Sequence, residues 1–217
     1  MTLTRRTVHP LLATLVAGAL VACSSGTAGS TGGGLDSRTT STQTATASPS
    51  PAAPTDAGAP AAGTPAAAAW EALMSPDGEY AASAAYAAVI EEYGGVEPYV
   101  SIRTAEERHI AALTRQLTRM GVDVPENPWL GRIAAPASLK EAAQAWADGE
   151  VANVALYDDL MAQASGDANL TRVFTNLRRA SQESHLPMFR AAAAADGTLS
   201  ASEVAGMEQH GSNGAGH

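Results

Sequence analysis

The sequence predicts an all-α protein, an antiparallel four-helix bundle preceded by a disordered linker. From about residue 67 the chain is rich in alanine and charged residues and poor in Phe and Trp. It also lacks the alternation of apolar and polar residues that marks a strand. Glycines and prolines divide this part into segments of helical length. Four long helices in one domain most often pack as an antiparallel bundle.

The first half of this domain contains two of the expected helices. Pro65 favours a helix start, so we expect a helix at 67–74 that resumes, after a Ser-Pro-Asp-Gly turn, at 79–93. A pair of glycines ends it. The second helix, 99–120, begins after Glu-Pro and ends at Gly121, because glycine favours the end of a helix.

The second half contains two long helices and a short one. Ser138 and Glu141 have the spacing of a capping box, which predicts a helix at 139–163. A Gly-Asp pair interrupts the chain, and 168–195 is the fourth long helix. An Asp-Gly pair ends that helix, and a short helix is expected at 201–207. The folded domain is therefore 67–207.

The N-terminal residues have the features of an export signal. A basic head is followed by an apolar stretch at 11–22, which is shorter than the roughly 20 residues that cross a bilayer. We therefore interpret 1–22 as a signal peptide. The residues Leu-Val-Ala-Cys at 20–23 resemble the lipobox of bacterial lipoproteins. This resemblance implies a lipid on Cys23, the chain's one cysteine, and a location at the extracytoplasmic face of the cell membrane.

Two alternatives stay open for this region. The first is an ordinary cleaved signal that leaves an accidental cysteine. A lone exported cysteine cannot form an internal disulfide, and acylation accounts for it better. The second concerns the export route, since Arg5 and Arg6 also resemble a twin-arginine signal.

Residues on either side of the domain are expected to lack a fixed fold. Ser, Thr, Gly, Ala and Pro dominate 23–66, which cannot bury enough apolar surface to fold and is predicted to be a disordered tether. Residues 208–217 are expected to form a flexible tail. The formal net charge of −9 argues against nucleic acid as a partner, so the expected attachment is to the membrane through Cys23. The sequence identifies no protein partner.

Each of the four long helices carries an acid or an imidazole on its apolar stripe. The residues concerned are Glu79, Glu106 with His109, Glu150, and His185. Natural cores rarely accept several unpaired carboxylates, because burying each one is costly. A metal ion compensates them, and carboxylate oxygens with imidazole nitrogens suit iron, manganese or zinc. The Glu-x-x-His step places both ligands on one helical face.

Each position also has a simpler interpretation. Glu79 is expected at the start of a helix, where the helix dipole favours an acid. Glu106 has a potential ion-pair partner in Arg103, and Glu150 fits the edge of a bundle. A single histidine in a core is more often a hydrogen-bonded core residue than a ligand. The agreement among four helices favours the metal site.

Several short motifs occur in a familiar order: Glu79 through Tyr86 to Gly94, Ala105 to His109, Gly149-Glu150, and Asn176-Leu177 through Ser181 to His185-Leu186. Over about 79–189 they resemble the ferritin-like superfamily and, within it, the bacterial DUF2202 family. The resemblance implies a four-helix bundle around a carboxylate-rich metal site. The successive helices supply a Glu, a Glu-x-x-His, a Glu and a second Glu-x-x-His. It further implies Glu106 and Glu150 as bridging ligands, Glu79 as a terminal ligand, and Tyr86 and Tyr157 as their partners or core residues.

The fourth motif departs from this pattern. Gln182 stands three residues before His185, and the nearest acid, Glu183, stands two residues before it. Two residues span about 200° of a regular helix, so Glu183 and His185 cannot share a face there. Pro187 predicts a kink or bulge, which would turn Glu183 inward. Otherwise Gln182 is at best a weak, neutral ligand.

These patterns predict an anchored protein that holds one or two ions of iron or another divalent transition metal. Its expected role is to oxidise Fe(II) or to react with oxygen or peroxide. The alternative is a metal-free helical module of a surface lipoprotein that binds another protein. A third hypothesis is metal sequestration by His210 and His217 in the tail. The sequence shows no separate catalytic residue.

Overall fold

A computed structural model describes residues 58–213 of the chain. Within this range all regular structure is helical and there is no β-strand, which confirms the predicted all-α class. The predicted signal peptide, Cys23, most of the tether and the last four residues lie outside the described residues. No helix in 58–213 combines the length and the apolar character that crossing a membrane requires.

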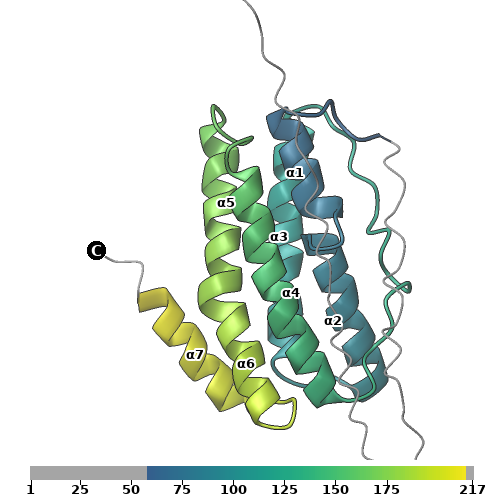
Figure 1. The fold of residues 1–217 in the computed structure, drawn as a ribbon, viewed down its shortest axis with the longest axis vertical. Coiled ribbons are helices and arrows are strands. Elements are labelled where there is room, and N and C mark those ends of the chain that lie inside the picture. The colour runs from purple at the N-terminus through teal and green to yellow at the C-terminus, as the bar shows by residue number, and fades with distance from the viewer. Residues whose placement is uncertain (1–57, 214–217) are drawn as a thin grey trace, which may run out of the picture. The chain divides into compact units, whose positions relative to one another are not determined.

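The helices follow the order that the sequence predicts (Figure 1). They are α1 (Pro65–Met74), α2 (Glu79–Tyr93), α3 (Tyr99–Arg119), α4 (Leu139–Leu160), α5 (Ala168–Ala180), the π-helical turn η1 (Ser181–His185), α6 (Leu186–Ala194) and α7 (Ala201–Asn213). Most helix ends lie within two residues of the prediction, and two differ by more. Helix α4 ends at Leu160 instead of 163, and α7 continues to Asn213, into the range expected to be a tail.

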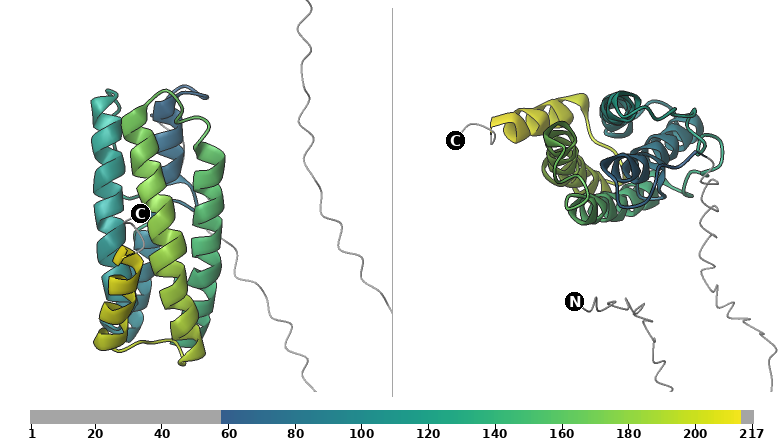
Figure 2. Two further views of the ribbon diagram at one scale, coloured as in Figure 1. Left: turned by 90° about the vertical axis from the view of Figure 1, so that its left-hand side faces the viewer. Right: turned by 90° about the horizontal axis from the view of Figure 1, so that it is seen from above.

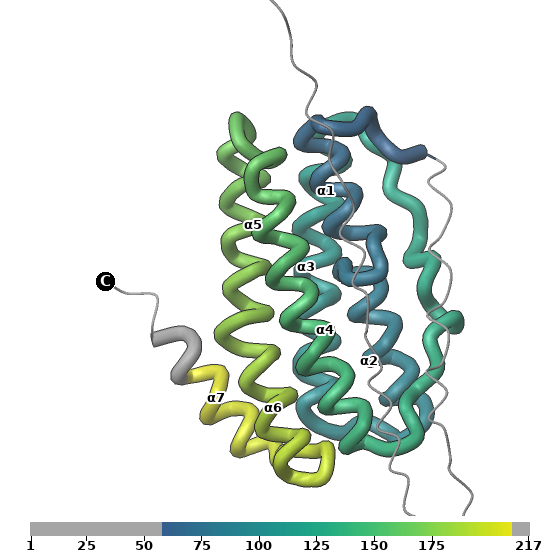
Figure 3. Tube along the Cα trace, in the orientation of Figure 1, coloured from purple at the N-terminus to yellow at the C-terminus, as the bar shows by residue number. Residues whose placement is uncertain are grey.

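The long helices lie alongside one another, with α1 stacked on α2 and α6 continuing the line of α5 (Figures 1 and 2). Helix α2 packs mainly on α3, and α4 mainly on α6. The segment 120–138 runs back along the side of these helices before α4 begins (Figure 3). Helices α3 and α4 therefore point in the same direction. A strictly alternating arrangement would instead have joined them by a short turn.

The break between α1 and α2 positions the first candidate ligand. Gly78 allows a close approach there, because a Cβ atom would lie 2.5 Å from the carbonyl oxygen of Ala72. Helix α2 begins at the next residue, so Glu79 is its first residue and is buried. The indole Nε1 of Trp129, in the segment 120–138, donates to the carbonyl of Met74 at 3.0 Å and covers this break.

The kink expected near Pro187 is present as η1. The N–H of Leu186 bonds to the carbonyl of Ser181, five residues earlier, so one extra residue is accommodated in the turn. Proline has no N–H to continue an α-helical ladder, which explains the place of the turn. Helices α5 and α6 nevertheless form one continuous column (Figure 3).

Two apolar clusters fill the interior, at opposite ends of the long helices. One contains the C-terminal parts of α3 and α4, with Leu113, Tyr157 and Phe174 among its members. The other contains their N-terminal parts, with Ile102 and Phe189. Along α3, α4 and the α5–η1–α6 column, the residues between the clusters are polar and buried. This polar layer is where the candidate site lies.

Candidate metal centre

The structure brings together all five residues that the sequence suggests as ligands. Within the described chain they form two groups that could hold an ion: Glu79, Glu106 and His109 in one, and Glu106, Glu150 and His185 in the other. In each group one potential ligand atom per residue lies within 4.8 Å of the others. Glu106 is common to both groups. Glu150 belongs to one only, so the bridging role expected of it is not reproduced by this geometry.

The first group joins α2 to α3. The Nδ1 atom of His109 lies 2.8 Å from Oε2 of Glu106 and 3.3 Å from Oε2 of Glu79. Glu106 and His109 are three residues apart on α3, which places both on the same inward face. Both carboxylates are buried, and the side chain of His109 is 13 % exposed.

The second group joins α3, α4 and η1. The Nδ1 atom of His185 lies 3.0 Å from Oε1 of Glu106 and 3.5 Å from Oε1 of Glu150. Its ring stacks on that of His109, with ring centres 5.5 Å apart and an angle of 24° between the planes. The two Nδ1 atoms thus approach the two oxygens of the Glu106 carboxylate, one on each.

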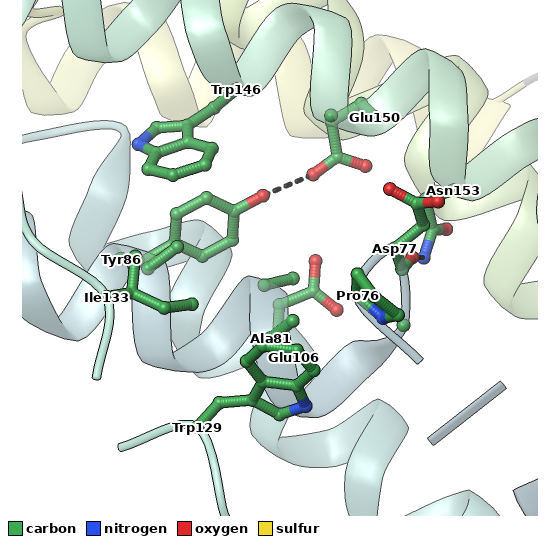
Figure 4. A pocket seen from close by; sticks show the side chains of 14 residues that line it. Pro76, Asp77, Ala81, Tyr86, Glu106, Trp129, Ile133, Trp146, Glu150 and Asn153 are labelled. Carbon is green, nitrogen blue, oxygen red and sulfur yellow. Dashed lines mark hydrogen bonds between the residues drawn. The ribbon is translucent and has the colours of Figure 1, made fainter. Parts of the chain in front are cut away.

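Two buried tyrosines hold the outer carboxylates. The hydroxyl of Tyr86 donates to Oε1 of Glu150 at 2.6 Å, as Figure 4 shows, and that of Tyr157 donates to Oε1 of Glu79. Burial and the adjacent carboxylates raise the pKa of both tyrosines well above the usual value, so both stay protonated as donors. Each tyrosine therefore fixes one carboxylate oxygen. The other oxygen faces His109 in Glu79 and has no hydrogen-bond partner among the described residues in Glu150.

The fourth helix contributes no carboxylate. The expectation that a bulge would turn Glu183 inward is wrong, because Glu183 is exposed. Gln182 is also exposed, and its side-chain oxygen accepts from Nη1 of Arg178 at 2.6 Å. Ser181, four residues before His185, lies with it on the inner face, as regular helical spacing places it, and is buried.

A hydrogen-bonded pair occupies the side of the cluster where a fourth carboxylate is missing. The Ser181 hydroxyl donates to Oδ1 of Asn153 at 2.8 Å, and Nδ2 of Asn153 donates to the carbonyl of Asp77 at 2.9 Å. Ser181 and Asn153 are not among the site residues that the sequence predicts. Helical spacing could have indicated them, because they share the apolar stripes of His185 and Glu150.

Glu106 does not form the ion pair with Arg103 that its simpler interpretation expects. Nη2 of Arg103 lies 3.5 Å from Oε1 of the exposed Glu107, one residue along α3. The basic groups that the structure places beside Glu106 are the two imidazoles. Glu106 is therefore a member of the cluster and not one half of a surface ion pair.

The protonation of the cluster reflects its burial. Burial and the charge of Glu106 raise the pKa of Glu79 from 4.5 to about 8. Burial also acts to raise the pKa of Glu106, but Glu79, His185 and His109 together hold it well below the usual value. Burial would lower the pKa of His109, yet Glu106 and Glu79 raise it to about 10. In the metal-free protein, protons thus balance the buried carboxylates.

Two atoms of the second group make no hydrogen bond. Oε2 of Glu150 is buried and has no hydrogen-bond partner among the described residues. Nδ1 of His185 is close to two carboxylate oxygens but forms no hydrogen bond of acceptable geometry with them. Such unsatisfied atoms are rare in natural interiors, and an ion between them would satisfy both. Three carboxylates and two imidazoles are a donor set that suits iron, manganese or zinc.

The residues present thus fit a metal pair in which one carboxylate is shared. Tyr86 and Tyr157 each hold one of the carboxylates by a hydrogen bond, as outer partners do in metal sites. Comparisons of the chain with models of protein families, with curated proteins and with solved structures find no match.

Proposed function

We propose that the protein holds two divalent transition-metal ions, iron foremost, at the centre of a ferritin-like four-helix bundle. The observation that carries this proposal is the pair of ligand groups joined by Glu106. Glu79 and His109 would hold one ion, Glu150 and His185 would hold the other, and Glu106 would be shared by both.

The bundle assignment is supported by the direction of the helices. Ferritin-like bundles contain one long crossover connection. Segment 120–138 is a connection of this kind, since it joins α3 to α4 along the length of the molecule (Figure 1). The resemblance of the motifs to the DUF2202 family adds to this support.

The proposed role is iron or oxidant handling at the outer face of the membrane. Two iron ions would supply one-electron chemistry toward oxygen or peroxide. The chain itself contributes the orientation of the ligands. Tyr86 and Tyr157 fix the outer carboxylates, and an apolar cluster packs on each side of the layer along the helices. The lipid on Cys23 would fix the location, and the acidic balance of the chain disfavours nucleic acid.

The test is metal analysis of the purified protein, prepared without a histidine tag and loaded with Fe(II) under anaerobic conditions. Two ions per chain are expected. Glu106→Gln removes the shared ligand and should abolish binding of both, whereas Glu150→Gln should leave one. Glu107→Gln is the matched control, because Glu107 is the next residue on α3 and its side chain is 57 % exposed.

Fewer than one ion in the unmodified protein would contradict the proposal. The bundle would then be the metal-free interaction module that the sequence also allows. Full metal content in the Glu106→Gln protein would show that the ions bind elsewhere.

A further inference from the structure

A cavity of about 300 Å³ leads from the surface to one edge of the candidate metal centre. It lies between α2, α4 and the segment 120–138 (Figure 4). Ala81 and Ala85 of α2 and Trp129, Ile133 and Trp146 form its mainly apolar walls. A cavity of about 150 Å³ in another protein holds benzene, so this one accommodates a small organic molecule.

The inner end of the cavity is polar. Glu106 and Glu150 line it, whereas Glu79, His109 and His185 are not among the lining residues. Glu150 is 2 % exposed, and its Oε2 atom makes no hydrogen bond with any described residue. The cavity therefore meets the cluster at the Glu106–Glu150 edge, where the fourth helix supplies no carboxylate.

Gly149 lines the cavity at its solvent-exposed end. It is exposed and lies within the regular helix α4, where glycine is less favourable than alanine. No positive φ requires it, and a Cβ atom would meet only Cε3 of Trp146, at an ordinary distance of 3.7 Å. Gly149 lies on the helical face that includes Trp146, Glu150 and Asn153, all of which line the cavity. A side chain at Gly149 would fill the mouth.

We infer that this cavity binds a small, mainly apolar molecule with one neutral oxygen-containing group, and that Gly149 keeps its mouth open. The oxygen group lies against the Glu106–Glu150 edge, and its contact with an ion there rests on the proposed function. No described basic side chain lines the cavity, so a carboxylate ligand lacks a partner. The buried carboxylates already face two imidazoles, so an organic cation is not required to balance their charge.

The probe is 4-fluorobenzyl alcohol, followed by fluorine NMR. It should bind the metal-free protein, with line broadening that saturates as protein is added. In protein loaded with Co(II), the same resonance should show a paramagnetic shift, because its polar end lies beside the cluster. Metal content is measured separately on each sample.

The decisive variant is Gly149→Leu, which should weaken probe binding at least tenfold without changing metal content. Asp148→Leu is the matched control. It adds a leucine at the adjacent, exposed position of α4, which does not line the cavity, and should bind the probe as the unmodified protein does. Thermal unfolding confirms that both variants fold.

The outcomes separate the two proposals. Probe binding that Gly149→Leu abolishes, in a protein that binds no metal, supports the cavity inference and overturns the proposed metal function. Absent probe binding, or equal binding by both leucine variants, overturns the cavity inference while the metal analysis stands. A bound probe without a paramagnetic shift in Co(II)-loaded protein overturns its placement beside the cluster.

Discussion

At the scale of single residues, the cluster shows how neighbouring groups decide which buried side chains keep their protons. Glu79 and Glu106 are both buried and both contact Nδ1 of His109, yet their pKa values shift in opposite directions. Glu106 faces two imidazoles, whereas Glu79 faces one and is held by a tyrosine hydroxyl. Without a metal, Glu79 and not Glu106 is therefore the one of these two that retains a proton near neutral pH.

These shifts predict that the metal-free protein loses stability as the pH rises. Folding raises the pKa of Glu79 from 4.5 to about 8 and that of His109 from 6.5 to about 10. The folded state holds these protons more tightly than the unfolded chain, so their contribution is complete at low pH and declines over those two ranges. The decline should be steepest between pH 6.5 and 8, where the ranges overlap. Thermal unfolding in the presence of a chelator measures it.

The matched variants for this experiment are Glu79→Gln and Glu107→Gln. The first removes one of the groups whose pKa folding raises, while His109 and His185 remain, and it should make the decline shallower. The second changes an exposed carboxyl group on α3 and should preserve it. An equal pH dependence in both variants would show that the decline arises outside the cluster.

At the scale of elements, the features that could be predicted from the sequence are those that a few neighbouring residues determine. The Ser138 capping box and the glycines after α2 mark helix ends within a few residues, and the structure reproduces them. The five ligand residues follow from three- and four-residue spacing alone. The direction of α4 could not be predicted in this way, because segment 120–138 has no periodic pattern to show where it runs. Pro187 predicts a bulge, but it does not show that Gln182 and Glu183 stay exposed.

Ser181, which is buried on the inner face of η1, is expected to have a structural role. Ser181→Ala leaves Oδ1 of the buried Asn153 without its donor, which should destabilise the protein by about 1–3 kcal/mol. Metal content should stay unchanged, because Ser181 belongs to neither ligand group. Thr175→Ala is the control, since its hydroxyl bonds to the carbonyl of Thr171 on the exposed side of α5. Urea unfolding measures the stability, and loss of one ion from the Ser181→Ala protein would instead identify Ser181 as a ligand.

At the scale of the whole molecule, the polar layer divides one interior into two apolar clusters. Helices α3, α4 and the α5–η1–α6 column all pass from one cluster through this layer to the other. Within this layer the helices contact one another through three carboxylates and two imidazoles. Buried charges of this kind contribute little net stability by themselves, because their desolvation offsets their attraction. The polar layer is thus the part of the molecule in which a bound ion would add most to the stability of the fold.

Metal binding should therefore stabilise the whole fold against heat. An ion that binds only the folded state adds about 2.7 kcal/mol when its free concentration is about 100 times Kd. For a domain of this size that corresponds to roughly 5–10 °C in Tm for each occupied site. Calorimetry should show this increase with Fe(II) or Co(II), and Glu106→Gln should abolish it. Mg²⁺ should have little effect, because it prefers an octahedron of oxygen ligands to imidazole. An equal increase with Mg²⁺, or with Co(II) in the Glu106→Gln protein, would assign the stabilisation to the acidic surface instead of the polar layer.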